Sequence, residues 1–309
     1  MSQDWRNKAI LVRLTVGSWS GNAGQRKCRQ IAAEVEQQHG TAHGKIKADA
    51  ELLAKEDRAA VQAIVSEGRS YYYSVTVPWD DRGWRMLPAR LFVEFKERMT
   101  QLGARLEQAV QETILNRYFE LKDKAERCLN GLAQKVEFPS QENLAKRFNW
   151  KVAVEQLPRP EDLRVECLTD FQMEQLREEM RQRQESQLRA GVSAMVEQLR
   201  ALVANLAEQL RRRDECEATS AERRVPIHDS LIENIREACR VLPGLNISGD
   251  PFLANLIQRV QNELAGFEVE ELRASRMRRK EAQHKASSLL ADLANYQSEV
   301  PDVLETCAA

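Results

Sequence analysis

The chain has 309 residues, of which 30% are charged and only 6% aromatic, a composition typical of long helices. Its 46 lysine and arginine residues nearly balance 47 aspartate and glutamate residues, which excludes a global field that would draw the protein to nucleic acid or an anionic membrane. No stretch approaches ~18 consecutive apolar residues and no signal peptide is recognisable, so neither a membrane span nor secretion is predicted. The cysteines show no C-x-x-C spacing, which favours thiols in a cytoplasmic protein; they are Cys28, Cys128, Cys167, Cys216, Cys239 and Cys307.

The first quarter of the chain combines β-branched runs with short helical patterns. The helix after the first strand should end at the two Gly-containing turns of residues 39–44. The expected elements are a strand at 8–16, a glycine-rich loop at 17–24, helices at 25–38 and 47–67, a strand at 71–77 and a structured loop at 78–88.

From Pro88 to Leu132 apolar residues recur at intervals of three and four. This spacing predicts one continuous amphipathic helix of about 40 residues, about 60 Å long. Ser140 is then a good N-cap for a short helix. Residues 150–156 and 163–168 are predicted strands that would form a small sheet with 8–16 and 71–77.

The second half is simpler, with helices predicted at 170–216 and 250–296 and a short helix near 228–241 between them. Two long helices joined by a compact tip suggest an antiparallel hairpin. The expected fold class is therefore mainly α with a small β element, built from long amphipathic helices and this hairpin. The expected domains are an α+β region at 1–169 and the coiled-coil-like hairpin at 170–309.

Both hairpin helices contain a polar stretch, at residues 177–187 and 273–285. Counting back from the tip places the two stretches at similar distances, so we predict that they face each other in a charged waist. The apolar runs 188–210 and 253–267 would then pack together beyond the waist.

Residues 71–88 hold three of the five tyrosines and two of the five tryptophans. Clustered aromatic side chains form either the core of a domain or a recognition surface. The candidate interaction residues in this segment are Tyr72, Trp79, Asp80, Trp84 and Arg85. Asp80 and Asp81 could act as an acid/base pair, but adjacent aspartates in a turn more often accept hydrogen bonds from local backbone N–H groups.

Two further motifs partly resemble known ligand-binding motifs. The loop 17–24, between a strand and a helix, could bind an anion through Gly21, Gly24, Arg26 and Lys27, although its spacing matches neither phosphate-binding glycine motif and Trp19 stands where a nucleophile elbow needs serine. His39 and His43 lie four apart, but the glycines that follow them argue against a helical zinc site. No catalytic residue, metal or cofactor is predicted.

The one dense basic patch consists of Arg273, Arg276, Arg278, Arg279 and Lys280. It could contact nucleic acid, or it could pair across the waist with acidic residues of the other helix; these are Glu174, Glu178, Glu179 and Glu185. No aromatic residue is interleaved with the cations, which disfavours binding of single strands by stacking.

Three segments of the chain together resemble an uncharacterised domain-of-unknown-function family of tailed bacteriophages and integrative elements. They are the loop Trp19-Ser20-Gly21, the segment Thr76-Val77-Pro78-Trp79-Asp80-Asp81-Arg82-Gly83-Trp84-Arg85-Met86-Leu87-Pro88, and Phe138-Pro139-Ser140. The resemblance is clearest over residues 8–170. It implies a mobile-element setting in a bacterial cytoplasm, with an AAA+ ATPase and a von Willebrand A-type protein as candidate partners. It supplies no catalytic residues.

We therefore expect a non-enzymatic helical interaction or scaffold protein that self-associates and works with an ATPase assembly. The alternative is a DNA- or RNA-binding accessory of phage replication or recombination that uses the basic patch 273–280.

Overall fold

The computed structural model describes residues 5–22, 25–48, 50–136, 138–218, 226–247 and 249–307. It confirms a mainly helical fold with one small sheet. The chain divides into two compact units, and the division does not fall at the expected boundary near residue 169. Unit 1 comprises Met1–Arg13, Tyr73–Val93 and Val154–Ala309, and unit 2 comprises Leu14–Tyr72 and Glu94–Ala153.

The sheet has four strands in the order β2-β3-β1-β4. Strands β2 (Val77–Pro78) and β3 (Arg85–Pro88) form an antiparallel hairpin, and β3 pairs antiparallel with the start of β1 (Ala9–Gly17). The last strand is β4 (Asn149–Glu155). Strands β1 and β4 confirm two of the predicted strands.

Two other predicted strands are wrong. Residues 163–168 form no strand; they follow the short 3₁₀ turn η5 (Pro160–Asp162). Residues 71–74 are the last turn of helix α2 (Ala59–Ser74). There Tyr72 is buried and continues the apolar face of Val65 and Gly68, and both Tyr71 and Tyr72 lie about 6 Å from the ring of Phe95. Burial on a continuous helix face overrides the β-propensity of the tyrosines.

In unit 2, helix α1 (Gln25–His39) agrees with the prediction, but α2 begins twelve residues later than the predicted helix start at residue 47. Residues 50–58 are irregular because Leu52 and Leu53 belong to a loop rather than a helix face. Their backbone N–H groups donate to the Gly21 carbonyl at 2.7 and 3.0 Å, and both side chains are buried.

The predicted 40-residue helix is also interrupted. Helix α3 (Phe92–Val110) runs into a single π turn, η3 (Gln111–Leu115), before α4 (Tyr118–Leu129) and the 3₁₀ segment η4 (Asn130–Lys135). The wider turn is closed by a hydrogen bond from Asn116 N–H to the Gln111 carbonyl at 2.9 Å. The π turn changes the direction of the apolar face, so that Ile114 and Leu121 remain buried against the loop that holds Leu53.

Trp150 of β4 holds this strand against α2 and α3 in unit 2. A Cβ atom added at Gly68 would lie 2.1 Å from Trp150 Cη2, and one added at Gly103 would lie 2.8 Å from Trp150 Cδ1. The indole N–H donates to the Met99 carbonyl at 2.9 Å. Two glycines on neighbouring helices therefore form the space that the ring fills. Ser140 caps α5 (Gln141–Ala145) as predicted, with its hydroxyl accepting from Asn143 N–H.

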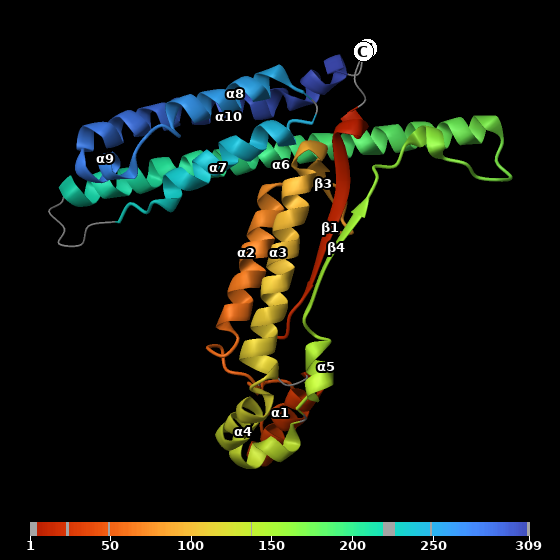
Figure 1. Ribbon diagram of the computed structural model, residues 1–309, viewed down its shortest axis with the longest axis vertical. Helices are drawn as coiled ribbons and strands as arrows, with labels where there is room; N and C mark the ends of the chain where they lie inside the picture. The colour runs from red at the N-terminus through yellow and green to blue at the C-terminus, as the bar shows by residue number, and fades with distance from the viewer. Residues whose placement is uncertain are drawn as a thin grey trace. The chain divides into compact units, whose positions relative to one another are not determined.

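Unit 1 is a helical bundle built on one very long helix, α6 (Asp170–Ala218). Helix α10 (Arg276–Cys307) lies antiparallel along α6, with α7 (Ser230–Leu245) and α8 (Pro251–Glu263) packed beside them (Figure 1). The predicted helix 250–296 is thus wrong, because it breaks after α8 and again after the short α9 (Val269–Ala274). Helix α8 folds back on α10, where Arg259 Nη1 lies 2.6 Å from Asp292 Oδ2 and the Tyr296 hydroxyl donates to Asp250.

The apolar runs 188–210 and 253–267 are buried, as expected. The residues of α6 that form the buried seam recur at intervals of three and four. They are Leu188, Val192, Met195, Leu199, Val203, Leu206 and Leu210, and α10 contributes Ala282, Ala286, Leu289 and Leu293. No helix among the described residues is both long and apolar enough to cross a lipid bilayer.

We predict that Gly68→Ala and Gly103→Ala each lower the free energy of unfolding by about 1–3 kcal/mol, because the new methyl group overlaps the Trp150 ring. Chemical denaturation measures the change. Gly131→Ala is the matched control, since nothing lies within 4 Å of its added Cβ. A Gly68→Ala variant as stable as the Gly131→Ala variant would contradict this role for Trp150.

Candidate interaction surfaces

The aromatic segment forms a closed hairpin whose indole rings are buried. Trp79 and Trp84 are each 8% exposed. Asp80 Oδ1 accepts from the backbone N–H groups of Arg82 at 3.0 Å and Trp84 at 2.9 Å, so this carboxylate organises the turn. Gly83, at φ +86°, supplies the left-handed position that the turn needs. Asp80 therefore has a local structural role.

Two arginine side chains, Arg85 of the hairpin and Arg13 of β1, lie against aromatic rings of this region. Arg85 donates to the hydroxyl and the carbonyl of Thr76, both at 2.7 Å, and its guanidinium lies 4.9 Å from the ring centre of Tyr73. The guanidinium of Arg13 lies 4.7 Å from the ring centre of Trp84. Of the five candidate interaction residues, four thus shape the hairpin, while Tyr72 lies on α2 and packs on Phe95.

The hairpin rests directly on α6. A Cβ atom added at Gly191 would lie 3.2 Å from Met86 Cε and 3.3 Å from Val77 Cγ2. This close approach gives the segment a structural role within unit 1, as a platform for the long helix.

The basic patch is largely neutralised, and its partners are not those predicted. Arg279 is 1% exposed and donates to Asp214 at 2.5 Å, to Glu217 and to the Leu272 carbonyl at 3.0 Å. Residues 273–285 therefore lie beside the C-terminal end of α6, and the predicted charged waist with residues 177–187 is wrong. The reason is that residues 250–274 form the separate helices α8 and α9 instead of the first part of one long helix. Helix α10 therefore starts beside the C-terminal end of α6.

Two other cations of the patch also have carboxylate partners. Arg273 pairs with Asp229 at 2.9 Å, and Arg278 pairs with Glu271 and Glu281, both at 2.9 Å. Arg276 and Lys280 remain exposed on the first turns of α10. The patch thus offers a small part of the positive charge that its sequence suggests.

The candidate anion loop is anchored through Trp19. Its indole N–H donates to the Asn22 carbonyl at 3.1 Å, and the Arg147 guanidinium lies 5.5 Å from the ring centre. Gly21, at φ +80°, turns the chain so that its carbonyl can accept from the loop at residues 52–53. Gly24 and the side chains of Arg26 and Lys27 lie outside the described residues, so anion binding here stays a prediction.

Glu36 orders the turn that contains the histidine pair. Its carboxylate accepts from Ile46 N–H at 2.8 Å and Gly44 N–H at 3.0 Å, and His43 Nδ1 lies 3.2 Å from it. These hydrogen bonds lower the pKa of Glu36, and the bond from Ile46 has the largest effect. Within the described part of the chain, no group of three or more His, Cys, Asp or Glu side chains is placed to hold a metal ion.

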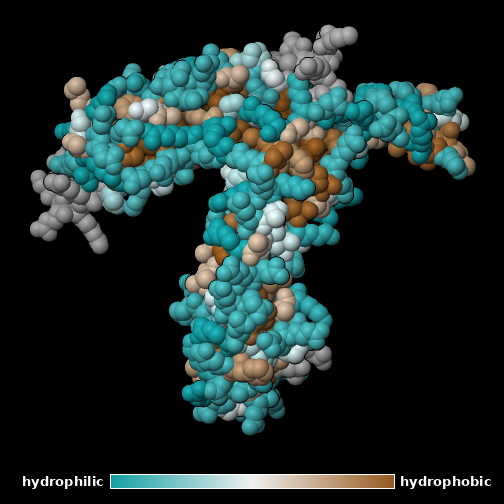
Figure 2. All heavy atoms as spheres, viewed as in Figure 1, coloured by the Kyte–Doolittle hydropathy of each residue, from teal (hydrophilic) through white to brown (hydrophobic). Residues whose placement is uncertain are grey.

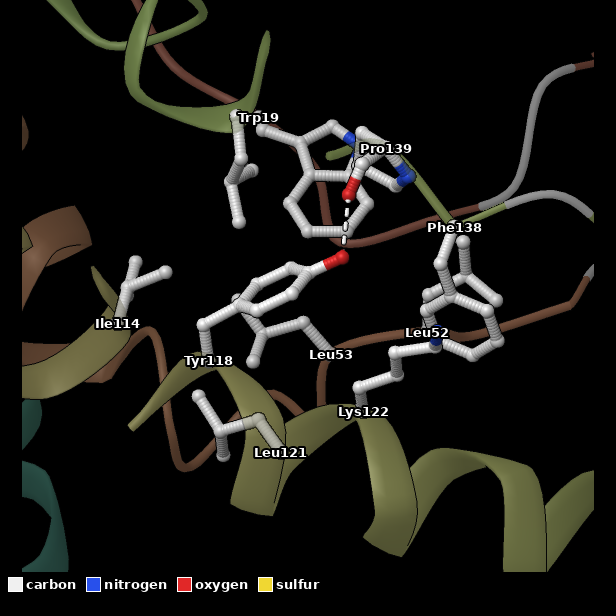
Figure 3. A pocket seen from close by; sticks show the side chains of 10 residues that line it. Trp19, Leu52, Leu53, Ile114, Tyr118, Leu121, Lys122, Phe138 and Pro139 are labelled. Atoms are coloured by element: carbon white, nitrogen blue, oxygen red, sulfur yellow. Dashed lines mark hydrogen bonds between the residues drawn. The ribbon is translucent and has the colours of Figure 1, made fainter. Parts of the chain in front are cut away.

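One pocket in unit 2 is lined almost wholly by apolar side chains (Figure 3). The Tyr118 hydroxyl points across it and donates to the Pro139 carbonyl at 2.7 Å. Its interior space of about 20 Å³ is close to that of a single water molecule and far below that of a cofactor site. The lining residues are Trp19, Leu52, Leu53, Ile114, Tyr118, Leu121, Lys122, Phe138, Pro139 and Leu144.

The N-terminal end of α6 is the exposed surface that the sequence reasoning missed. The first buried residue of the helix is Gln184, which accepts from Arg6 Nε and donates to the Pro158 carbonyl, both at 2.8 Å. Before it, Phe171 is 72% exposed and Leu176 36% exposed, and Val165 in the preceding loop is 46% exposed. Apolar side chains gather at this end of α6 in the space-filling view (Figure 2). We call residues 163–183 the α6 end.

The polar stretch at 177–187 is the feature of the sequence that could have indicated that this part of the helix is exposed. A helical stretch without an apolar face is held by its own ion pairs rather than by burial. Arg181 supplies them here, at 3.0 Å from Glu174 and 3.2 Å from Glu178.

Comparison with protein-family models, with curated proteins and with solved structures finds no match for this chain.

We predict that Arg279→Met lowers the free energy of unfolding by about 3–5 kcal/mol, because it leaves the partly buried Asp214 without its cation. Arg276→Met is the control, and as an exposed substitution it should change stability by less than about 0.5 kcal/mol. Urea unfolding of the two variants measures both values. Equal stability of the two variants would show that the buried ion pair does not fix α10 on α6.

Proposed function

We propose that this chain is a non-enzymatic interaction protein that self-associates and offers the α6 end to a protein partner. The observation that carries the proposal is the exposure of Phe171 and its apolar neighbours on a helix that continues into a packed bundle. A rigid helix with an exposed aromatic side chain is a typical element of helix-in-groove recognition.

The local geometry supports binding rather than chemistry. The carboxylates of Asp80 and Glu36 accept hydrogen bonds from backbone N–H groups, and the pocket in unit 2 has space for about one water molecule. The resemblance of the Trp19 loop and the hairpin segment adds the setting: a phage or integrative element in a bacterial cytoplasm, with an AAA+ ATPase or a von Willebrand A-type protein as the partner.

The alternative function, nucleic-acid binding, rests on the exposure of Arg276 and Lys280 on adjacent turns of α10. Because Arg279 is buried, its substitution would disturb folding and cannot test this alternative. Arg276→Ala combined with Lys280→Ala is the suitable variant.

We predict an oligomer that resists high salt and does not respond to DNA. Size-exclusion chromatography with light scattering, at low and high salt, with and without a DNA oligonucleotide, measures this. A monomer at every concentration would contradict self-association. A salt-sensitive complex with DNA that is lost in the Arg276→Ala/Lys280→Ala variant would favour the alternative instead.

We further predict that Phe171→Ser weakens binding to the AAA+ ATPase or von Willebrand A-type partner by about tenfold, because burial of the ring is lost. Isothermal titration calorimetry with each purified partner measures the affinity. Phe119→Ser is a matched control, since Phe119 is 75% exposed on a different helix, α4. An equal effect of the two substitutions would exclude the α6 end as the docking site.

A further inference from the structure

Strand β4 lies at an edge of the sheet, with β1 as its only neighbour among the described strands (Figure 1). Within the described residues, no backbone group of β4 bonds to a turn or loop. Val154 is 47% exposed, and Lys151 and Glu155 are also exposed. One side of β4 therefore presents every second N–H and C=O group to an incoming strand.

The sequence of this edge is complementary to itself. The segment is Lys151-Val152-Ala153-Val154-Glu155. Read in reverse, it has the same Val-Ala-Val centre, and the positive and negative ends change places. In an antiparallel pair of identical strands centred on Ala153, Lys151 faces Glu155 of the second copy, and Val152 faces its Val154. A two-fold axis repeats each contact, so the interface contains two oppositely charged pairs and two valine pairs.

The side chains of β4 are oriented for such a pairing. Trp150 points to the helices, where Gly68 and Gly103 receive it. Because successive side chains of a strand alternate between its faces, Lys151, Ala153 and Glu155 lie on the opposite face. Their charges can meet those of a second strand without displacing the Trp150 contact.

We propose that two copies of this chain associate by antiparallel pairing of their β4 strands, centred on Ala153. The proposal rests on the self-association proposed above and assigns it a surface. A lysine on an edge strand normally discourages pairing, but here one register places it opposite a glutamate. Seven residues span about 23 Å, which is short for a stable interface, so the association should be reversible in the micromolar range.

Charge reversal tests the register. Lys151→Glu places two glutamates opposite each other at both ends of the interface, and Glu155→Lys does the same with lysines. Each should raise the dimer dissociation constant by about tenfold, and the double variant Lys151→Glu/Glu155→Lys should restore it. Sedimentation equilibrium at low ionic strength measures the constants. Lys146→Glu, at the exposed residue that caps the C-terminus of α5, controls for the change in net charge.

The outcomes separate this inference from the proposed function. A wild-type chain that stays monomeric refutes both self-association and the β4 pairing. If the wild-type chain forms an oligomer whose dissociation constant is unchanged by the single charge reversals, only the β4 pairing is refuted. The same holds if the double variant dimerises as weakly as either single variant. Equal weakening by Lys146→Glu would refute it as well, because the effect would then come from net charge.

Discussion

The fold of unit 1 depends on the antiparallel packing of α10 against α6, and the buried guanidinium of Arg279 fixes their register. It contacts Asp214 and Glu217 of α6 and the Leu272 carbonyl of α9. A shift of one helical turn would leave the buried charge without its partners, which costs far more than the loss of an exposed ion pair. A buried charge is not by itself strong support for stability, but it excludes alternative alignments of two helices that have similar apolar seams.

This register explains why one end of α6 is exposed. Antiparallel helices advance at the same 1.5 Å per residue, so α10, which meets α6 at Asp214 and ends at Cys307, extends to roughly residue 186. Gln184, the first buried residue of α6, lies close to this point, and its hydrogen-bond partners are Arg6 and the Pro158 carbonyl rather than residues of α10. Residues 170–183 extend past the covering helix, and their helical structure relies on continuity with the packed part and on exposed ion pairs within the helix. A surface that is ordered yet uncovered is suited to binding.

The sequence predicts the fold class and the helices with continuous periodicity, and it fails where a distant contact decides the local structure. The break after α8 falls near Gly266, but a single glycine is tolerated in helices. The apolar face of α8 is buried where this helix packs back on α10, and that packing is not visible in the local sequence. The π turn after Val110 does not interrupt the spacing of apolar residues, so periodicity alone cannot locate it.

The candidate sites show the same limit. The basic run 273–280 is plain in the sequence, but its neutralisation depends on Asp214, Glu217 and Asp229, all distant along the chain. The aromatic segment was expected to be either core or surface, and burial of Trp79 and Trp84 makes it core. The self-complementary edge at Lys151–Glu155 could have been read from the sequence, but only the strand order makes it an edge.

We propose that this chain acts through association, with an exposed strand edge joining two copies. Amide hydrogen exchange of the wild-type protein, followed by mass spectrometry at low and high protein concentration, tests it most directly. Peptides covering β4 should exchange more slowly at high protein concentration, while exchange of peptides from the buried part of α6 should not change. Exchange in β4 that is independent of protein concentration would contradict it.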